Sequence, residues 1–308
     1  MIINISNQVY RTHFKQDPHP FISESFINLN QHKVERVMRL VDDNGKFSIG
    51  LLVGVKEGIL KSPFSAPFGG FHFSSEELHI SEISNFINNL KEFLYRQNFQ
   101  KVEVTLPPEI YHTSFNAKLV NSFIRNGFKI HTPEITNYVN LNAFDGTFSK
   151  REVNKNIRAA IKNNTSFHQV TEKWMQMEAY EIIAKNREIN GRKIFMTFSD
   201  LLNTMKIIPI DFFLVKDSLN KNLASAIFYR GHKKIVQGVF WGDTETGRPL
   251  RVMDFLAMNL YLHYRKLGFD FIDLGISTED GFPNEGLIRF KEIHNATSSP
   301  RFSFTWTI

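Results

Sequence analysis

The stretch that decides the fold is Gly268–Lys291, GFDFIDLGISTEDGFPNEGLIRFK. It predicts a short buried strand, a loop rich in Asp, Glu, Ser, Thr and Gly, and then a helix that carries Phe290 and Lys291. A helix over residues 251–267 precedes the strand, and Gly268 stands where a C-terminal helix cap is expected. Before that helix, residues 223–242 indicate a β-hairpin. Proteins of the α/β class commonly place their chemistry in a polar loop that follows a strand.

The composition is that of an ordinary globular protein of two domains. The chain has 308 residues, 42% hydrophobic and 22% charged, and no cysteine. Without cysteine there is no disulfide scaffold, no thiol nucleophile and no cysteine-bound zinc. The net charge of +6 favours anionic partners such as phosphates, coenzyme A or RNA, although a host with lysine-rich proteins would give the same excess. The N-terminus does not read as a signal peptide and no apolar run would span a bilayer, so we expect a cytoplasmic protein.

The two halves of the chain resemble each other. Residues 81–107 and 254–276 each predict a helix, a tight turn and a strand. In an alignment with a one-residue indel, Tyr95-Arg96 and Asn98-Phe99 correspond to Tyr264-Arg265 and Gly268-Phe269. Duplication of one α/β unit explains this economically, and chance similarity is the other explanation. We therefore expect domains at 1–148 and 149–308.

A basic helix over about 149–165 is expected to link the two domains. Its cations are Lys150, Arg151, Lys155, Arg158 and Lys162. Apolar residues recur every fourth position, so one face is expected to be docked. The charged face is either simply solvated or a phosphate-binding surface.

Four motifs in order resemble the FemAB-like branch of the GNAT superfamily, in which two GNAT folds are fused. They are SPFSAPFGGF at Ser62–Phe71, RAAIKNN at 158–164, the helix followed by GFDFIDLG, and Arg289-Phe290-Lys291. The resemblance covers nearly the whole chain. It implies an α/β fold with mixed sheets, built as two tandem GNAT-like domains.

The resemblance also implies transfer of an acyl group to an amine in a bacterial protein. Acetyl-CoA or another acyl-CoA is the favoured donor, and a small-molecule amine, such as a cell-envelope sugar or peptide precursor, is the acceptor. One alternative is an aminoacyl-tRNA donor, with tRNA as a partner. The other alternative is a double-GNAT binding protein without catalysis. The chain departs from the family in lacking room for a helical-hairpin arm and in lacking a recognisable pyrophosphate-binding turn.

The resemblance implies that Lys291 lies beside the transferred acyl group and stabilises the tetrahedral oxyanion. Glu279 and Asp280, in the loop after the strand, are candidates for accepting the amine proton, and Glu285 is a third. The alternative is that this loop is solvated and that Asn284 caps the last helix. Asp273, within the strand, is expected to be a buried and hydrogen-bonded structural carboxylate.

The loop GDTETGRPLR, residues 242–251, is a candidate site for the phosphates of the donor. It leads into a helix N-terminus, which favours anions, and the predicted binding residues are Asp243, Arg248 and Arg251. A plain polar connection between strand and helix is the other interpretation.

Several further residues are candidates for contact with substrate. The shaped turn that contains Phe68, Gly69 and Gly70 is expected to line an acceptor groove with His72 at its edge, or else to be a packed turn. Aromatic contacts are predicted for Tyr229, Trp241 and Phe290, for which core packing is the alternative. No histidine pair or carboxylate triad predicts a metal site.

Overall fold

The computed structural model describes residues 1–43 and 45–308, and the chain divides into two compact units. Unit 1 comprises residues 1–135, 278–282 and 299–308, and unit 2 comprises 136–277 and 283–298. These units differ in their ranges from the domains expected at 1–148 and 149–308, which remain a prediction about where the two repeats divide. No helix in the part of the chain that the structure describes has the length and apolar character needed to cross a membrane.

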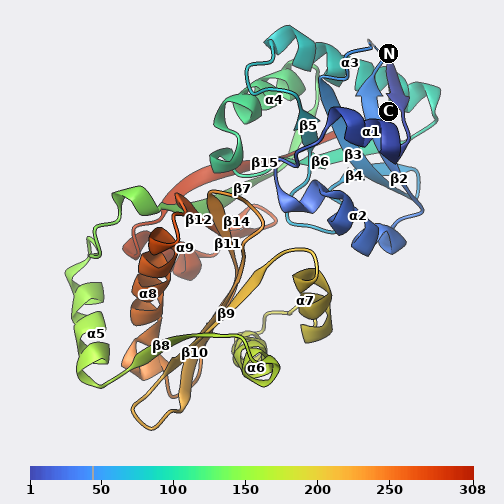
Figure 1. The fold of residues 1–308 in the computed structure, drawn as a ribbon. Coiled ribbons are helices and arrows are strands. Elements are labelled where there is room, and N and C mark those ends of the chain that lie inside the picture. Colours follow the sequence, from blue (N-terminus) through green and yellow to red (C-terminus); the bar gives the residue numbers. More distant parts are fainter. Residues whose placement is uncertain (44) are drawn as a thin grey trace. The chain divides into compact units, whose positions relative to one another are not determined.

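Unit 1 is a mixed sheet with helices on both faces (Figure 1). The strand order is β1-β2-β3-β4-β6-β15, and β5 pairs with β3. All the pairs are antiparallel except β4 with β6. The strands are β1 (Ile2–Asn4), β2 (Arg36–Asp42), β3 (Ile49–Lys56), β4 (Ile59–Ser62), β5 (Phe71–Phe73), β6 (Lys101–Thr105) and β15 (Thr297–Thr307).

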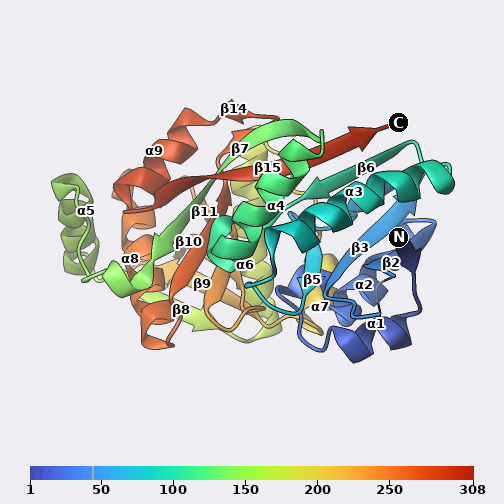
Figure 2. The same ribbon diagram turned by 90° about the horizontal axis from the view of Figure 1, so that it is seen from above.

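Helices α3 (Ile80–Arg96) and α4 (Thr113–Arg125) cover one face of this sheet, and α1 (Asn7–His13) and α2 (Glu24–Asn30) lie on the other (Figure 2). The α3 and α4 face holds the main core of the unit, in which Ile83, Leu90 and Phe123 pack against the strands. Apolar residues of α3 recur at helical spacing because only one stripe of the helix meets the sheet.

Unit 2 repeats this plan. Its strand order is β7-β12-β11-β10-β9-β8, in which only β11 and β12 are parallel. The strands are β7 (Lys129–Asn140), β8 (Ser166–Val170), β9 (Ile210–Lys216), β10 (Asn222–Tyr229), β11 (Ile235–Asp243) and β12 (Phe271–Ile276). The helices are α5 (Arg151–Lys162), α6 (Lys173–Ile189), α7 (Phe198–Met205), α8 (Val252–Lys266) and α9 (Glu285–Ile293).

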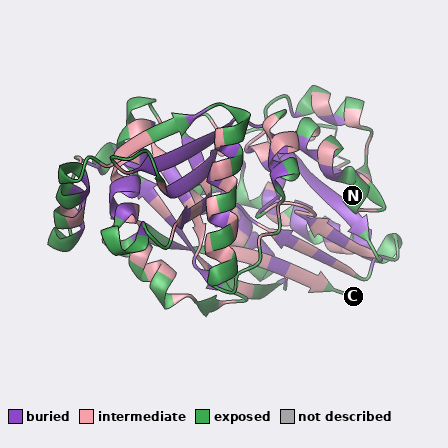
Figure 3. Cartoon of the chain, turned by 90° about the horizontal axis from the view of Figure 1, so that it is seen from below, coloured by how far each residue is buried: buried purple, intermediate pink, exposed green. Residues whose placement is uncertain are grey.

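Helix α8 is buried on most of its surface because it lies between the sheet of unit 2 and α5. Tyr261 and Tyr264 of α8 have no exposed surface, and Val153 and Ile157 of α5 belong to the same core. The outward face of α5 is exposed, as Figure 3 shows by its colour. The basic residues expected in this segment therefore lie on a real amphipathic helix with one docked face.

The two units repeat one order of strands and helices, and the caps of the corresponding helices α3 and α8 correct the alignment of the repeat. After α3, the Phe99 amide donates to the Leu94 carbonyl at 3.1 Å; after α8, the Phe269 amide donates to the Tyr264 carbonyl at 3.1 Å. Asn98 and Gly268, the residues before these donors, both have positive φ, at 56° and 84°. Tyr264 therefore corresponds to Leu94 rather than Tyr95, and no indel is needed. The expected C-terminal cap at Gly268 is confirmed.

Each unit is completed by a strand from the other half of the sequence. The last part of β7 follows the helices of unit 1 but pairs with β12, where Tyr138 lies opposite Asp273. The last part of β15 follows the helices of unit 2 but pairs with β6, where Phe304 lies opposite Val104. The two repeats have thus exchanged their final strands.

Candidate functional site in unit 2

The candidate site begins where the two parallel strands of unit 2 separate. Strands β11 and β12 are paired at Ile235–Gln237 and Phe271–Asp273, and the described residues of β11 beyond Gln237 have no partner in β12. On the β12 side, pairing with β7 is irregular between Asp273 and Ile276, and Gly275 has φ of 67°. A splayed strand pair with an irregular edge leaves backbone carbonyl groups available for contacts other than sheet pairing.

Lys291 uses these carbonyl groups. Its Nζ donates to the carbonyl oxygens of Gly275 at 2.8 Å and Ile276 at 3.0 Å, and the residue is only 5% exposed. Burial lowers the pKa of Lys291 to about 7, against the opposing effect of the nearby Asp273 carboxylate. Lys291 is therefore not the exposed lysine that its position on a short helix would otherwise suggest.

The helix that carries Lys291 is fixed at its start by the expected cap. The Asn284 side chain accepts from the Leu287 amide at 3.0 Å, and the Asn284 amide donates to the Ser277 carbonyl at 2.9 Å. The expected structural role of Asp273 is also confirmed, because it is 1% exposed and accepts from the Gly275 amide at 2.8 Å.

Two of the three predicted aromatic contacts lie together near Lys291. The ring of Phe290 lies 6.4 Å from that of Trp241 on β11, between centroids, and both side chains are half-buried. Trp241 also contacts Phe228. Tyr229 is buried at the far end of β10, and its hydroxyl donates to the Met196 sulfur at 3.7 Å.

The loop between β11 and α8 is held by polar contacts that the sequence does not predict. Arg248 forms an ion pair with Asp243 at 3.2 Å, and Asn186 donates to the same carboxylate at 2.8 Å. Arg251 is the N-cap residue of α8 in a left-handed conformation, with φ of 55°. The three predicted phosphate-binding residues thus lie in one loop, and the guanidinium of Arg248 already has an anionic partner.

Glu279 and Asp280 belong to a different unit from Lys291. They lie in the segment 278–282 of unit 1, where β13 (Thr278–Glu279) pairs with β14 (Phe282–Pro283). Both are exposed, and Asp280 has φ of 51° in the connecting turn. Glu285 begins α9 in unit 2 and is also exposed. Their role in accepting a proton remains a prediction.

The remaining predicted residues are buried inside unit 1. Phe68 is 1% exposed and contacts the rings of Phe21 and Tyr111. Strand β4 ends at Ser62, and the Gly69 amide then donates to the carbonyl of Thr105, at the end of β6, at 3.0 Å. The segment around Gly69 therefore occupies the space beside the end of β6. A side chain at Gly69 would lie 2.7 Å from the Pro63 nitrogen, which explains the glycine.

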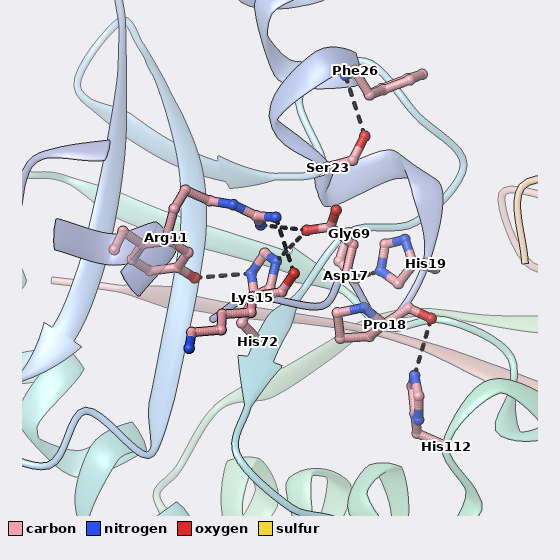
Figure 4. A network of polar contacts seen from close by, with 11 residues as sticks. Arg11, Lys15, Asp17, Pro18, His19, Ser23, Phe26, Gly69, His72 and His112 are labelled. Carbon is pink, nitrogen blue, oxygen red and sulfur yellow. Dashed lines mark hydrogen bonds and ion pairs between the residues drawn. The ribbon is translucent and has the colours of Figure 1, made fainter. Parts of the chain in front are cut away.

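His72 lies in a buried polar network (Figure 4). Its Nδ1 is 2.9 Å from the Tyr10 hydroxyl, and its Nε2 is 3.0 Å from the Asp17 carboxylate. Arg11 pairs with the same carboxylate at 2.6 Å. Burial lowers the pKa of His72, against the effect of Asp17. The ring is thus enclosed by partners within unit 1.

Unit 1 has no lysine where unit 2 has Lys291. The Ala296 amide donates to the Lys291 carbonyl at 3.1 Å after α9, and the Phe128 amide donates to the Phe123 carbonyl at 3.0 Å after α4. Because α4 leads into β7 as α9 leads into β15, the shared cap places Phe123 at the position of Lys291. Phe123 is fully buried and stacks on Phe304 with ring centroids 4.6 Å apart.

The structure also reveals site residues that the sequence did not indicate. They are the carbonyl groups of Gly275 and Ile276, and the side chains of Asp254 and His294, which join α8 to the end of α9 at 2.9 Å. Among the described residues, no group of three or more His, Asp or Glu side chains could hold a metal ion.

Comparison with known proteins identifies the fold. No protein-family model matches the chain, and no curated protein matches it in sequence. Among solved structures, it is similar to FemX, with 13% identity and a TM-score of 0.69 over 100% of this chain and 97% of FemX. It is similar to the C-terminal domain of a putative lysylphosphatidylglycerol synthetase from Agrobacterium fabrum, with 13% identity and a TM-score of 0.57 over 97% of this chain and 92% of that one.

A tandem GNAT protein from the clavulanic acid biosynthesis pathway is a third similar structure, with 9% identity and a TM-score of 0.52 over 100% of this chain and 98% of that protein. The expected FemAB-like fold of two tandem GNAT-like units with mixed sheets is therefore confirmed. At such low identities the likeness concerns the fold, and the chemistry has to be argued from the site.

Proposed function

We propose that unit 2 catalyses transfer of an acyl group to an amine, with Lys291 beside the reacting carbonyl. The observation that carries this proposal is the buried Lys291 amine, held on the carbonyl groups of Gly275 and Ile276 where β11 and β12 separate. A lysine is seldom buried without a functional or ion-pair reason, because desolvation of an ammonium group is costly.

The hydrogen bonds of Lys291 define what it can do. An ammonium group has three N–H donors, and two of them are used by the carbonyl groups of β12. The third can donate to the oxyanion that develops when the acceptor amine attacks the acyl carbon. That attack forms the new C–N bond; the tetrahedral intermediate then collapses, the carbonyl reforms, the bond to the donor breaks and the amine nitrogen loses a proton. The leaving thiolate or ribose oxygen gains a proton.

For the donor we favour an acyl-CoA such as acetyl-CoA. The loop that leads into α8 offers Arg248, Arg251 and the first amide groups of that helix to phosphates. Asp243 would have to release Arg248, or share it, when an anion binds. The acceptor we propose is a small-molecule amine of a cell-envelope sugar or peptide precursor. The domain of a putative lysylphosphatidylglycerol synthetase among the similar structures is named for a lipid product, and it supports a cell-envelope substrate without supporting a sugar or a peptide in particular.

One observation favours aminoacyl-tRNA as a second candidate donor. Five cations lie on or beside α5, and none of them has an ion pair with a described residue; they are Lys150, Arg151, Lys155, Arg158 and Lys162. Unpaired cations on an exposed helix face attract a phosphate backbone, with a binding constant that falls steeply with salt.

Calorimetric titration with acetyl-CoA, with free coenzyme A as a second ligand, tests the donor. We expect saturable micromolar binding that is lost in the double variant R248A/R251A and kept when the exposed Arg125 of unit 1 is replaced by alanine. Salt-sensitive binding of tRNA alone, lost on replacing the cations of α5, would favour the second donor. If neither donor binds, both donor assignments are overturned, and the alternative of a double-GNAT binding protein without catalysis is favoured.

A further inference from the structure

A buried histidine–aspartate pair lies one helical turn beyond Lys291. His294 follows the last residue of α9 and has no exposed surface. Its Nε2 lies 2.9 Å from the carboxylate of Asp254, which is 7% exposed. The other oxygen of Asp254 accepts from the Asn156 side chain at 2.7 Å. The chain of contacts therefore joins α9, α8 and α5 within unit 2.

The His294 ring faces an acceptor at both nitrogens. Its Nδ1 lies 2.6 Å from the carbonyl oxygen of Phe290, and a carbonyl oxygen can only accept. One hydrogen shared between Nε2 and the carboxyl group of Asp254 makes the second contact of the ring. Both ring nitrogens and both oxygens of Asp254 are therefore engaged in hydrogen bonds, as buried polar groups must be.

This pair adds polar contacts to a short helix whose apolar side chains, Phe290 and Ile293 among them, are partly buried. Helix α9 has nine residues, and Lys291 is the one among them that is buried. At its end, the His294 carbonyl accepts from the Tyr261 hydroxyl of α8 at 3.1 Å, and the His294 ring binds the first turn of the same helix. Because a nine-residue helix with partly buried apolar side chains buries limited area, these polar contacts contribute to its placement.

We propose that His294 is a positioning residue for Lys291. Through Asp254 it fixes α9 against the first turn of α8 and keeps the Lys291 amine on the carbonyl groups of β12. Since α8 starts at the loop to which the donor phosphates are assigned, the same pair sets the distance between donor and lysine. The importance of His294 for catalysis rests on the proposed function, whereas its effect on Lys291 can be measured without a catalysed reaction.

The test is the titration of Lys291 by NMR in protein labelled with ¹³C-lysine, where the Lys291 signal is identified by its loss in K291M. In the wild type we expect a midpoint of about 7. In H294N the new amide can replace Nδ1 toward Phe290 but cannot reach Asp254. Lys291 then gains water, and its midpoint should rise by about one pH unit or more toward the ordinary value of about 10.4.

Two further variants separate position from general stability. In H294Q the amide can replace Nε2 toward Asp254, so the midpoint should stay near that of the wild type. In S225A a buried hydroxyl that donates to the Ala179 carbonyl at 2.6 Å is lost elsewhere in unit 2, which should lower stability without moving the midpoint. If H294N does not fold, N156A loosens Asp254 from its other side and should give a smaller rise.

The possible failures can be told apart. An unchanged Lys291 midpoint in H294N, or in N156A where H294N does not fold, overturns the positioning role and leaves the proposed function standing. A wild-type midpoint near 10 overturns the buried amine on which the proposed function rests. A rise in S225A equal to that in H294N would show that the midpoint follows stability alone, which also overturns the positioning role.

Discussion

Lys291 and His72 are two buried titratable residues whose pKa values depart from the ordinary in the same direction for the same reason. Burial lowers the pKa of each because the charged form loses water. Lys291 has two carbonyl acceptors and His72 has a carboxylate and a hydroxyl. The folded protein therefore holds fewer protons at these residues than the unfolded chain does, and both contribute to how stability depends on pH.

For Lys291 the effect falls between about pH 7 and pH 10. The unfolded lysine titrates at about 10.4 and the folded one at about 7, so the unfolded chain binds more protons in that window. The free energy of unfolding should therefore rise with pH there, by up to about 1.4 kcal/mol per pH unit from this residue. K291M should lack this slope while it keeps the fold. Urea unfolding of both proteins across the window measures it, and parallel curves would contradict it.

For His72 the effect falls at acid pH. The folded pKa lies below the ordinary value of about 6.5, so stability from the neutral ring is full above that value and is lost as the pH falls through the folded pKa. The charged groups around it are Asp17, Arg11 and Arg39. Asp17 contributes a further loss of folding stability at lower pH. Burial would raise the pKa of Asp17, but hydrogen bonds from His72 and Arg11 outweigh it and keep that pKa low. We expect H72Q to show a shallower decline in thermal stability between about pH 7 and pH 5.

At the scale of elements, the short helix α9 is where local sequence has most effect. It begins with a capping asparagine and has glycine at its second position. A methyl group at Gly286 would have 3.8 Å to its nearest neighbour, Asn284 Oδ1, which is ordinary contact. The backbone at Gly286 does not require glycine. The low helix propensity of glycine therefore makes α9 less stable than it would be with alanine at this position.

Two substitutions in α9 should therefore act in opposite directions. G286A should stabilise the protein by up to about 1 kcal/mol through helix propensity. N284A should cost about 1 kcal/mol because the Leu287 amide loses its acceptor. Thermal unfolding of both variants and of the double variant measures this. If both variants shifted the melting temperature in the same direction, neither helix propensity at Gly286 nor the cap at Asn284 would explain the stability of α9.

The order of elements in 251–291 could be predicted because its signals are local. A glycine cap, an apolar strand and an asparagine before a helix each act within a few residues. The burial of Lys291 could not be derived from the sequence alone, because it depends on carbonyl groups of β12 that are turned out by an irregular pairing with β7. Sequence similarity aligns the repeat one residue out because both helices end with a Tyr-Arg pair, whereas the caps of α3 and α8 give the structural correspondence.

The contacts of the turn at Phe68–Gly70 also could not be predicted from local sequence. Its two glycines and flanking prolines indicate a shaped backbone, and the structure has one, but nothing local states what the turn packs against. It fills the space beside β6, in the repeat where Phe123 replaces lysine. The two repeats differ in their cores. In unit 2 the strands β11 and β12 separate beside Lys291, whereas in unit 1 the chain around Gly69 occupies the space beside β6. This difference becomes visible only when the two structures are compared.

At the scale of the whole molecule, the exchanged strands make each unit depend on both ends of the sequence. In unit 1, β15 pairs with β6 over five residues and places Phe304 against Phe123. Loss of a fully buried phenylalanine costs about 3–5 kcal/mol, a large part of the stability of a domain.

Deleting residues 299–308 should therefore unfold unit 1, although these residues are remote from it in sequence. Fragment 1–148 should fail to fold for the same reason. Limited proteolysis with mass spectrometry would show cleavage in α3 and α4 of the deleted protein and protection in the full chain. Removal of Ile308 alone, which is half exposed, is the control and should leave the pattern unchanged.

The exchange also governs the order in which the protein can be made. On the ribosome, the residues of unit 1 emerge first, but β6 has no partner on one side until residues 299–308 have been added. At roughly 5–20 residues per second, synthesis of the intervening unit leaves this edge and the Phe123 face open for on the order of 10–30 s. A nascent chain in that state is a ready ligand for a chaperone, and a slow ribosome would prolong its exposure.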